Sequence, residues 1–267
     1  MRAFVKNFWV PKRGNSPGEY EDAFWVGSAG ISEGELDQSV LRLSLADGAS
    51  ESLLANRWAK LLVSCFGKTD GAATTAAGFM TAYGDATSQW DEELEGYKAD
   101  REARGSPIQW YEEPGLAKGA YATILAVEFR DDSEGESPAW TASGLGDSCI
   151  FQIRDESLYS SFPMSDASAF SFQPPLLPSR QADEAVLLRH VCLTASDWQP
   201  GDSFYLATDA LAAWFLREIE QDGRPWETLR DLDTSDALLD FPEWVDQQRD
   251  LGRLQNDDTT LLRIDII

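Results

Sequence analysis

Residues 41–50 read Leu-Arg-Leu-Ser-Leu-Ala-Asp-Gly-Ala-Ser, and this stretch joins a strand, an acidic turn and the approach to a helix. Hydrophobic residues alternate along 41–46, which predicts a half-buried β-strand that stops at Asp47-Gly48. Ser50 fits a helix N-cap, because the apolar residues that follow it recur at helical spacing. These residues are Leu53, Leu54, Trp58, Leu61, Leu62 and Cys65.

Acidic residues border three further predicted strands. They are Glu21-Asp22 before 24–27, Asp209 after 204–208, and Asp257-Asp258 before 261–267. Carboxylates at strand ends cluster easily, and a cluster of anions is unfavourable unless a cation neutralises it. Hard divalent cations such as Mg²⁺ and Mn²⁺ take oxygen ligands. The pattern favours a metal centre, although each acid alone also fits a turn or a helix cap.

The remaining segments predict one α+β domain spanning residues 1–267. Segments 120–129 and 139–154 are rich in β-branched and aromatic residues and predict an antiparallel meander. Residues 71–84 and 90–104 predict two helices. Helices segregated from meandering strands favour an α+β fold over alternating βαβ units.

Two irregular stretches are expected to carry function. The Pro/Ser/Phe-rich loop at 160–180 has the length of a functional or partner-facing segment. Residues 222–243 are candidates for a flap beside the metal site. Three tryptophans nearby are expected in the core, because they share helical stripes with other apolar residues or lie among them: Trp214, Trp226 and Trp244.

The charge balance excludes some classes of partner. The chain has 22 Lys and Arg against 46 Asp and Glu, a formal net charge of -24, which would repel nucleic acids and anionic membranes. Three widely spaced cysteines, Cys65, Cys149 and Cys192, suit reduced core thiols of a cytosolic protein. Residues 1–11 do not resemble a signal peptide, and no stretch reaches the length of a membrane span. A cytoplasmic protein is expected.

Five motifs resemble, in their order along the chain, those of the PP2C-type (PPM) protein serine/threonine phosphatases. They are Tyr20-Glu21-Asp22-Ala23-Phe24, Ala46-Asp47-Gly48-Ala49-Ser50, Gly146-Asp147-Ser148, Leu206-Ala207-Thr208-Asp209 and Asp257-Asp258-Thr259-Thr260-Leu261-Leu262. The resemblance runs from about residue 14 to Ile267 and is stronger to the divergent bacterial branch. It implies a four-layer α-β-β-α sandwich, with two antiparallel sheets flanked by helices.

The resemblance also implies a centre of two Mn²⁺ or Mg²⁺ ions. Asp47 matches the aspartate that bridges both metals, and the Gly48 carbonyl matches a ligand of one of them. Asp209 and Asp257 match the two acids that complete the coordination shell of the other metal ion. Asp257 is preferred to Asp258 because adjacent strand residues point to opposite faces and because the family ligand stands three residues before the threonine, here Thr260.

Three further acids have implied roles. Glu21 and Asp22 match the pair that acts largely through water, and Asp147 matches the residue that contributes to a third, weaker metal site. Two cations can activate a water, orient it in line with a phosphomonoester and neutralise the phosphoryl oxygens. The implied function is hydrolysis of phosphoserine or phosphothreonine on proteins, with a cognate serine/threonine kinase or its targets as partners. The global charge favours phosphosites in basic contexts.

The sequence departs from the family pattern at two places. Pro17 stands where many relatives have the arginine that clamps the substrate phosphate, and Arg13 in the same loop is the candidate replacement, ahead of Lys12. Ala49 replaces the histidine of eukaryotic members, which bacterial relatives often lack. These departures motivate an alternative function, a catalytically silent PP2C-like module that binds a protein partner. A third possible function is that of an acidic interaction protein that has no catalytic or metal site.

Two other chemistries are disfavoured. His190, the single histidine, lies in an apolar run and is interpreted as a core or strand residue, not as catalytic. Residues 14–18, Gly-Asn-Ser-Pro-Gly, match the letters of a nucleophile elbow but lack the strand and helix that such an elbow needs.

Overall fold

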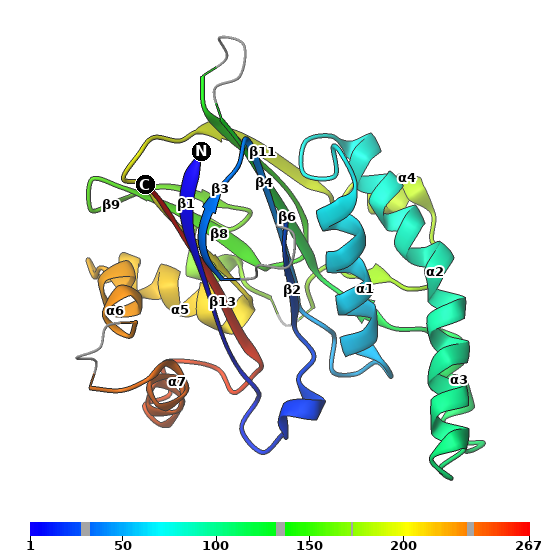
Figure 1. Ribbon diagram of the computed structural model, residues 1–267. Helices are drawn as coiled ribbons and strands as arrows, with labels where there is room; N and C mark the ends of the chain where they lie inside the picture. Colours follow the sequence, from blue (N-terminus) through cyan, green and yellow to red (C-terminus); the bar gives the residue numbers. More distant parts are fainter. Residues whose placement is uncertain (28–32, 132–136, 172, 234–237) are drawn as a thin grey trace.

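Two large antiparallel sheets form the centre of the computed structural model (Figure 1), which describes residues 1–27, 33–131, 137–171, 173–233 and 238–267. The first sheet has the order β3 (Gly34–Asp37), β1 (Arg2–Val10), β13 (Thr259–Ile266), β12 (Ser203–Ala207), β8 (Cys149–Arg154) and β9 (Ser157–Phe162). The second has the order β11 (Cys192–Asp197), β7 (Ala139–Leu145), β6 (Ile124–Arg130), β4 (Val40–Ala46) and β2 (Ala23–Val26). A small pair joins β5 (Tyr121–Ala122) to β10 (Leu177–Pro178).

Helices cover the outer face of each sheet. The helices are α1 (Ala55–Lys68), α2 (Ala76–Ala103), α3 (Glu113–Lys118), α4 (Glu184–Leu187), α5 (Asp209–Glu220), α6 (Pro225–Asp231) and α7 (Phe241–Asp250). One buried cluster packs α1 and α2 against the second sheet, another lies between the sheets, and a third packs α5, α6 and α7 against the first sheet. The layers are therefore α-β-β-α, and the expected α+β class is confirmed.

The strands that approach the acidic motifs are where the sequence predicts them. β4 ends at Ala46, directly before Asp47, and β12 ends at Ala207, two residues before Asp209. The predicted meander, however, does not stay in one sheet. β7 pairs with β6 and β11, whereas β8 pairs with β12 and β9, so the chain crosses between the sheets at 146–148. Gly146 makes this crossing with a φ of +117°, a conformation that L side chains rarely adopt.

Two helix predictions are corrected. The segments predicted as two helices, 71–84 and 90–104, belong largely to one continuous helix, α2. Ser50 is not the N-cap of α1, which begins at Ala55 after Leu54. The Ser50 hydroxyl instead donates a hydrogen bond to the Glu21 carboxylate. Ser50 therefore connects the motif that contains Asp47 to the motif that contains Glu21, and it does not cap α1.

Burial agrees with part of the core prediction. Trp214, Trp226 and Trp244 are buried, as are Cys65 and Cys149. His190 and Cys192 are exposed, because they lie in and after the turn that follows the short helix α4, so their assignment to the core is wrong. Of the candidate flap at 222–243, residues 234–237 lie outside the described residues. None of the helices that the structure describes combines the length and apolarity needed to cross a membrane.

Candidate metal-dependent active site

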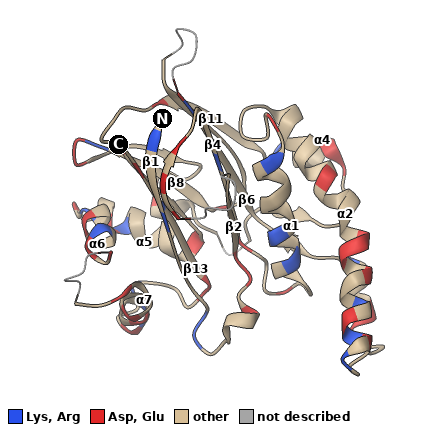
Figure 2. Ribbon diagram, in the orientation of Figure 1, with Lys and Arg blue, Asp and Glu red and all other residues tan. Residues whose placement is uncertain are grey.

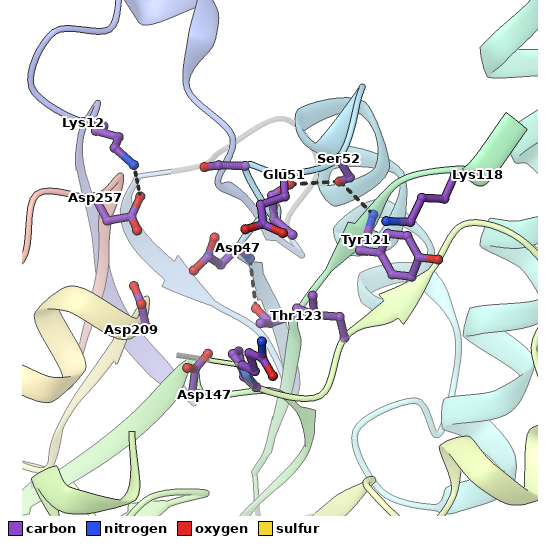
Figure 3. A pocket seen from close by; sticks show the side chains of 16 residues that line it. Lys12, Asp47, Glu51, Ser52, Lys118, Tyr121, Thr123, Asp147, Asp209 and Asp257 are labelled. Atoms are coloured by element: carbon purple, nitrogen blue, oxygen red, sulfur yellow. Dashed lines mark hydrogen bonds and ion pairs between the residues drawn. The ribbon is translucent and has the colours of Figure 1, made fainter. Parts of the chain in front are cut away.

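Four of the predicted aspartates line one cavity of about 700 Å³. Asp47, Asp147, Asp209 and Asp257 point toward it from different segments of the chain (Figure 3). Two of them border strands of the first sheet, one follows β4 of the second, and Asp147 lies at the crossing between the sheets. The fold thus assembles carboxylates that are up to 210 residues apart, from Asp47 to Asp257, around one space.

Thr123 holds the main chain of Asp47 on both sides. Its hydroxyl accepts a hydrogen bond from the Asp47 N–H at 3.0 Å, and its own N–H donates to the Asp47 carbonyl at 2.8 Å. Gly48 forms an isolated bridge with Ala122, so the turn after β4 is tied to β5. These contacts fix the direction in which the Asp47 carboxylate and the Gly48 carbonyl leave the sheet.

Asp22 lies beneath the cavity and is almost completely buried, with 1% exposure. Its Oδ2 accepts hydrogen bonds from the hydroxyls of Thr208 at 3.0 Å and Thr260 at 2.5 Å. Its Oδ1 is buried and has no hydrogen-bond partner among the described residues. A buried carboxylate oxygen without a partner is costly, so this atom calls for a cation, a water or a proton.

The electrostatics show that the carboxylates act on one another. Burial, followed by the charges of Asp22 and Asp209, raises the pKa of Asp47 well above its ordinary value. Burial and the neighbouring charge of Asp209 raise the pKa of Asp147 to about 7. Burial and the charge of Asp257 raise the pKa of Asp209 to about 6. These three carboxylates resist deprotonation because they are buried and because other acids are near, and a bound cation would lower this resistance.

Asp257 and Asp258 have different surroundings. The Asp258 carboxylate accepts hydrogen bonds from the main-chain N–H groups of Lys12 and Glu21, both at 2.6 Å. It therefore ties the loop between β1 and β2 to the start of β13. Asp257 faces the cavity, with the Lys12 Nζ at 3.7 Å from its Oδ1. Of these two residues, Asp257 is the one that lines the cavity.

Two other predicted residues lie outside the cavity lining. The Glu21 carboxylate is held by the Ser50 hydroxyl, and burial raises its pKa. The Arg13 guanidinium donates to Asp250 at 2.7 Å and to the Asp246 carbonyl at 3.0 Å, both on α7. The structure therefore does not bring Arg13 to the cavity. Lys12, which from the sequence is a weaker candidate than Arg13 for the phosphate contact, lines the cavity instead.

The donor set fits a hard divalent cation, although the side chains are not closed around one. Among the described residues, no three His, Cys, Asp or Glu side chains converge closely enough to hold a metal ion as they stand. The facing groups are nonetheless carboxylate and carbonyl oxygens, the kind that Mg²⁺ and Mn²⁺ select. The unpartnered Asp22 Oδ1 and the raised pKa values of Asp47 and Asp147 are compatible with a bound cation.

Several residues of the cavity were not predicted. Thr123 lines the cavity and holds the Asp47 main chain, but it is remote from the predicted acids in the sequence, so no local signal marks it. Thr208 supports Asp22 without lining the cavity, and its position directly before the predicted Asp209 was the available signal in the sequence. Lys118, Tyr121 and Ser52 carry no comparable signal. Lys118 at the end of α3 and Tyr121 at the start of β5 reach the cavity, and the pairing of β5 with β10 joins segments 55 residues apart, from Ala122 to Leu177. Ser52 lies in the turn between β4 and α1, where its hydroxyl accepts a hydrogen bond from the Tyr121 N–H at 3.1 Å.

Comparison with known proteins rests on structure, since no family model and no curated protein matches the sequence. The serine/threonine phosphatase PstP/Ppp of Mycobacterium tuberculosis is 15% identical, with a TM-score of 0.54 over 100% of this chain and 99% of that one. The S. agalactiae serine/threonine phosphatase is 15% identical, with a TM-score of 0.54 over 99% and 100%. The catalytic domain of PstP in complex with two manganese ions is 15% identical, with a TM-score of 0.52 over 99% of both chains.

The similarity extends over the whole length of these structures, and it shows that the chain has a PP2C-like fold. At 15% identity, this similarity shows the fold and nothing about activity. The same fold is found in RsbX in complex with magnesium, at 15% identity and a TM-score of 0.51 over 100% of this chain and 96% of that one. Structures of this fold therefore hold either of the two cations that the donor set favours.

Proposed function

We propose that the chain is a metal-dependent phosphatase that hydrolyses phosphoserine or phosphothreonine on proteins at a centre of two Mn²⁺ or Mg²⁺ ions. The observation that carries the proposal is the meeting of four aspartates, Asp47, Asp147, Asp209 and Asp257, around one cavity. A protein that only binds a partner gains nothing from carboxylates whose mutual repulsion is left unrelieved. The PP2C-like fold of serine/threonine phosphatases supports the same assignment.

Each residue has a proposed role. Asp47, the Gly48 carbonyl, Asp209 and Asp257 would hold the two cations, with Asp47 as the ligand that both would share. Bound cations would supply an activated water and neutralise the phosphoryl oxygens.

Three more acids are proposed to support this centre. Glu21 and Asp22 act through ordered water, held by Ser50 and by the two threonine hydroxyls respectively. Asp147 is proposed to contribute to a third, weaker cation site. In place of Arg13, which contacts α7, Lys12 is the proposed contact for a substrate phosphate.

The chain is proposed to work on phosphoproteins in the cytoplasm, with a serine/threonine kinase or its targets as partners. The chain is strongly acidic, and acidic residues recur along α2 (Figure 2). The net charge of -24 slows the approach of acidic partners at long range. Cations in the cavity would dominate the local field, so the net charge does not prevent phosphate binding there.

The test is hydrolysis of p-nitrophenyl phosphate and of a phosphothreonine peptide with Mn²⁺, Mg²⁺ or EDTA. We expect turnover that needs the cation and that Asp47→Asn abolishes, whereas Asp100→Asn on the exposed face of α2 leaves it unchanged. Calorimetric titration of Mn²⁺ provides a readout apart from activity. Metal binding without turnover would favour the silent binding module that Pro17 and Ala49 suggest. Absence of both would overturn the metal centre and leave an acidic interaction protein.

A further inference from the structure

The side of the cavity away from Asp257 is built by a separate unit of the fold. Its residues come from the end of α3, the start of β5 and the segment before β10: Lys118, Tyr121, Pro174 and Leu176. Figure 3 shows Lys118 and Tyr121 on one side of Asp47, with Lys12 and Asp257 on the other. We call this group of four residues the distal wall. It contains no carboxylate and therefore has no place in the proposed metal centre.

Hydrogen bonds anchor the distal wall to the helices behind it. The Trp58 indole N–H donates to the Leu177 carbonyl at 2.8 Å, and the Tyr83 hydroxyl donates to the Pro178 carbonyl at 3.0 Å. Ala120 and Ser179 exchange two further hydrogen bonds, at 2.8 and 2.9 Å. The Pro-rich loop of the sequence is thus fixed at its C-terminal end, so the wall is preorganised for a ligand.

Gly119 sets the direction of the chain at Lys118. It has a φ of +85°, and a Cβ there would lie 2.7 Å from the Ser179 Oγ. Only glycine adopts this conformation and this close approach without strain. The turn lets Lys118, the last residue of α3, lie beside the cavity while Tyr121 enters β5.

Lys118 is a cation without an anionic partner. Its Nζ lies 5.6 Å from the centroid of the Tyr121 ring, and no carboxylate pairs with it among the residues that the structure describes. Lys12, by contrast, is 3.7 Å from a carboxylate oxygen of Asp257. An aromatic ring holds an ammonium group in place without neutralising it. Lys118 therefore keeps its charge available to a ligand in the cavity.

We propose that the distal wall is a second anion-binding subsite, in which Lys118 contacts a carboxylate or a second phosphate of the same substrate. The proposal rests on the proposed phosphatase function and names its substrate class: segments with an acidic group near the phosphorylated residue. The net charge of the protein favours basic substrates, because it acts while a substrate approaches. The preference proposed here, for an acidic group in the bound substrate, is opposite because it depends on the local charge of Lys118. Glu51, an exposed acid that lines the same cavity, reduces the preference without pairing with Lys118.

The proposal is tested with phosphothreonine peptides that differ at one position. A neutral peptide is compared with two panels in which a glutamate or a phosphoserine is moved from three residues before the phosphothreonine to three residues after it. We expect the best acidic peptides to have a KM about threefold lower than the neutral one, the range of an exposed ion pair. Lys118→Ala should abolish this difference, Lys118→Glu should reverse it, and Glu51→Gln should increase it. Lys60→Ala, an exposed lysine of α1, is the control and should change nothing.

Two readouts separate this proposal from the proposed function. Hydrolysis of p-nitrophenyl phosphate, which has no second anion, should be the same in the wild type and in Lys118→Ala. If that hydrolysis occurs but the peptide preference is absent or does not depend on Lys118, the subsite is refuted while the phosphatase stands. If no hydrolysis occurs, the anisotropy of labelled phosphonate peptides, measured with Mn²⁺, gives the affinities directly. Equal affinities of the neutral and acidic peptides would overturn the subsite. The two panels distinguish a carboxylate from a second phosphate as the group that binds.

Discussion

The Thr260 hydroxyl donates a hydrogen bond to the Oδ2 of Asp22 at 2.5 Å, and this contact joins β13 to the residue before β2. Thr208 donates to the same oxygen. The two hydroxyls leave Oδ1 as the free atom of the carboxylate, and they determine where it points. The orientation of Asp22 thus depends on two side chains that do not line the cavity.

Thr260→Val should weaken Mn²⁺ binding by about tenfold, the lower end of the usual effect of removing a group that orients a metal ligand. The substitution keeps the shape of the side chain and removes one hydrogen bond to Asp22. Calorimetric titration of Mn²⁺ measures the effect. Thr141→Val is the matched control, because the Thr141 hydroxyl is buried without a hydrogen-bond partner among the described residues. Equal Mn²⁺ affinity in both variants would refute the role of Thr260.

The metal-free protein should lose stability as the pH rises from about 4 to about 7. The raised pKa of Asp147, about 7 against an ordinary value of 3.8, means that the folded protein binds more protons than the unfolded chain in this range. Its free energy of unfolding should therefore be lower at pH 7.5 than at pH 5.5, by at least about 1 kcal/mol. Urea unfolding in EDTA measures this, and Asp147→Asn should reduce the difference.

Added Mn²⁺ should reverse that trend. The cation binds deprotonated carboxylates, so its stabilising effect should be larger at pH 7.5 than at pH 5.5. Thermal unfolding at the two pH values with and without Mn²⁺ checks this expectation. Stabilisation that is the same at both values would indicate that Mn²⁺ binds elsewhere on the acidic surface.

Gly48→Ala should lower both stability and turnover. A Cβ at this position would lie 2.7 Å from the Glu21 carbonyl and 3.0 Å from Ala55, so the turn that carries Asp47 must shift. Overpacking of this kind costs about 1–3 kcal/mol. Gly84→Ala is the opposite case, since it lies within α2 with open space around it, and should stabilise by about 0.5–1 kcal/mol. Urea unfolding and p-nitrophenyl phosphate turnover of both variants test the contrast.

Lys12→Ala should raise the KM for p-nitrophenyl phosphate about threefold, as expected for one partly exposed ion pair. Arg13→Ala should leave it unchanged, because the Arg13 guanidinium contacts α7 and not the cavity. Steady-state kinetics of the two variants are compared at saturating Mn²⁺. The reverse result would mean that the loop refolds around the substrate and brings Arg13 to the phosphate.

The sequence locates the aspartates that line the cavity but not the other lining residues, for physical reasons. Asp47 and Asp209 follow strands with strong apolar patterns, so their position at a strand end is a local property. The direction of Arg13 depends on α7, which lies more than 230 residues further along the chain, and no local pattern reports that contact. The distal wall is likewise missed, because it forms only when β5 pairs with β10.

The fold class is recovered while its connections are not. The apolar patterns of the sequence identify β4, β12 and β13. They do not indicate that the chain passes from one sheet to the other at Gly146, because β7 and β8 on either side of it are both apolar. The sequence predicts separate helices at 71–84 and 90–104 and leaves residues 85–89 unassigned. In the structure this region continues as α2, with Phe79, Ala82 and Ala86 buried against the core.

The central position of β13 has a consequence for synthesis in the cell. This strand, residues 259–266, lies between β1 and β12 and provides Thr260, so the first sheet cannot close before these residues have left the ribosome. Pairing of β1 with β13 joins residues more than 240 positions apart, and contacts of such long range form slowly. A nascent chain would therefore carry its aspartates unassembled until β13 has paired with β1 and β12.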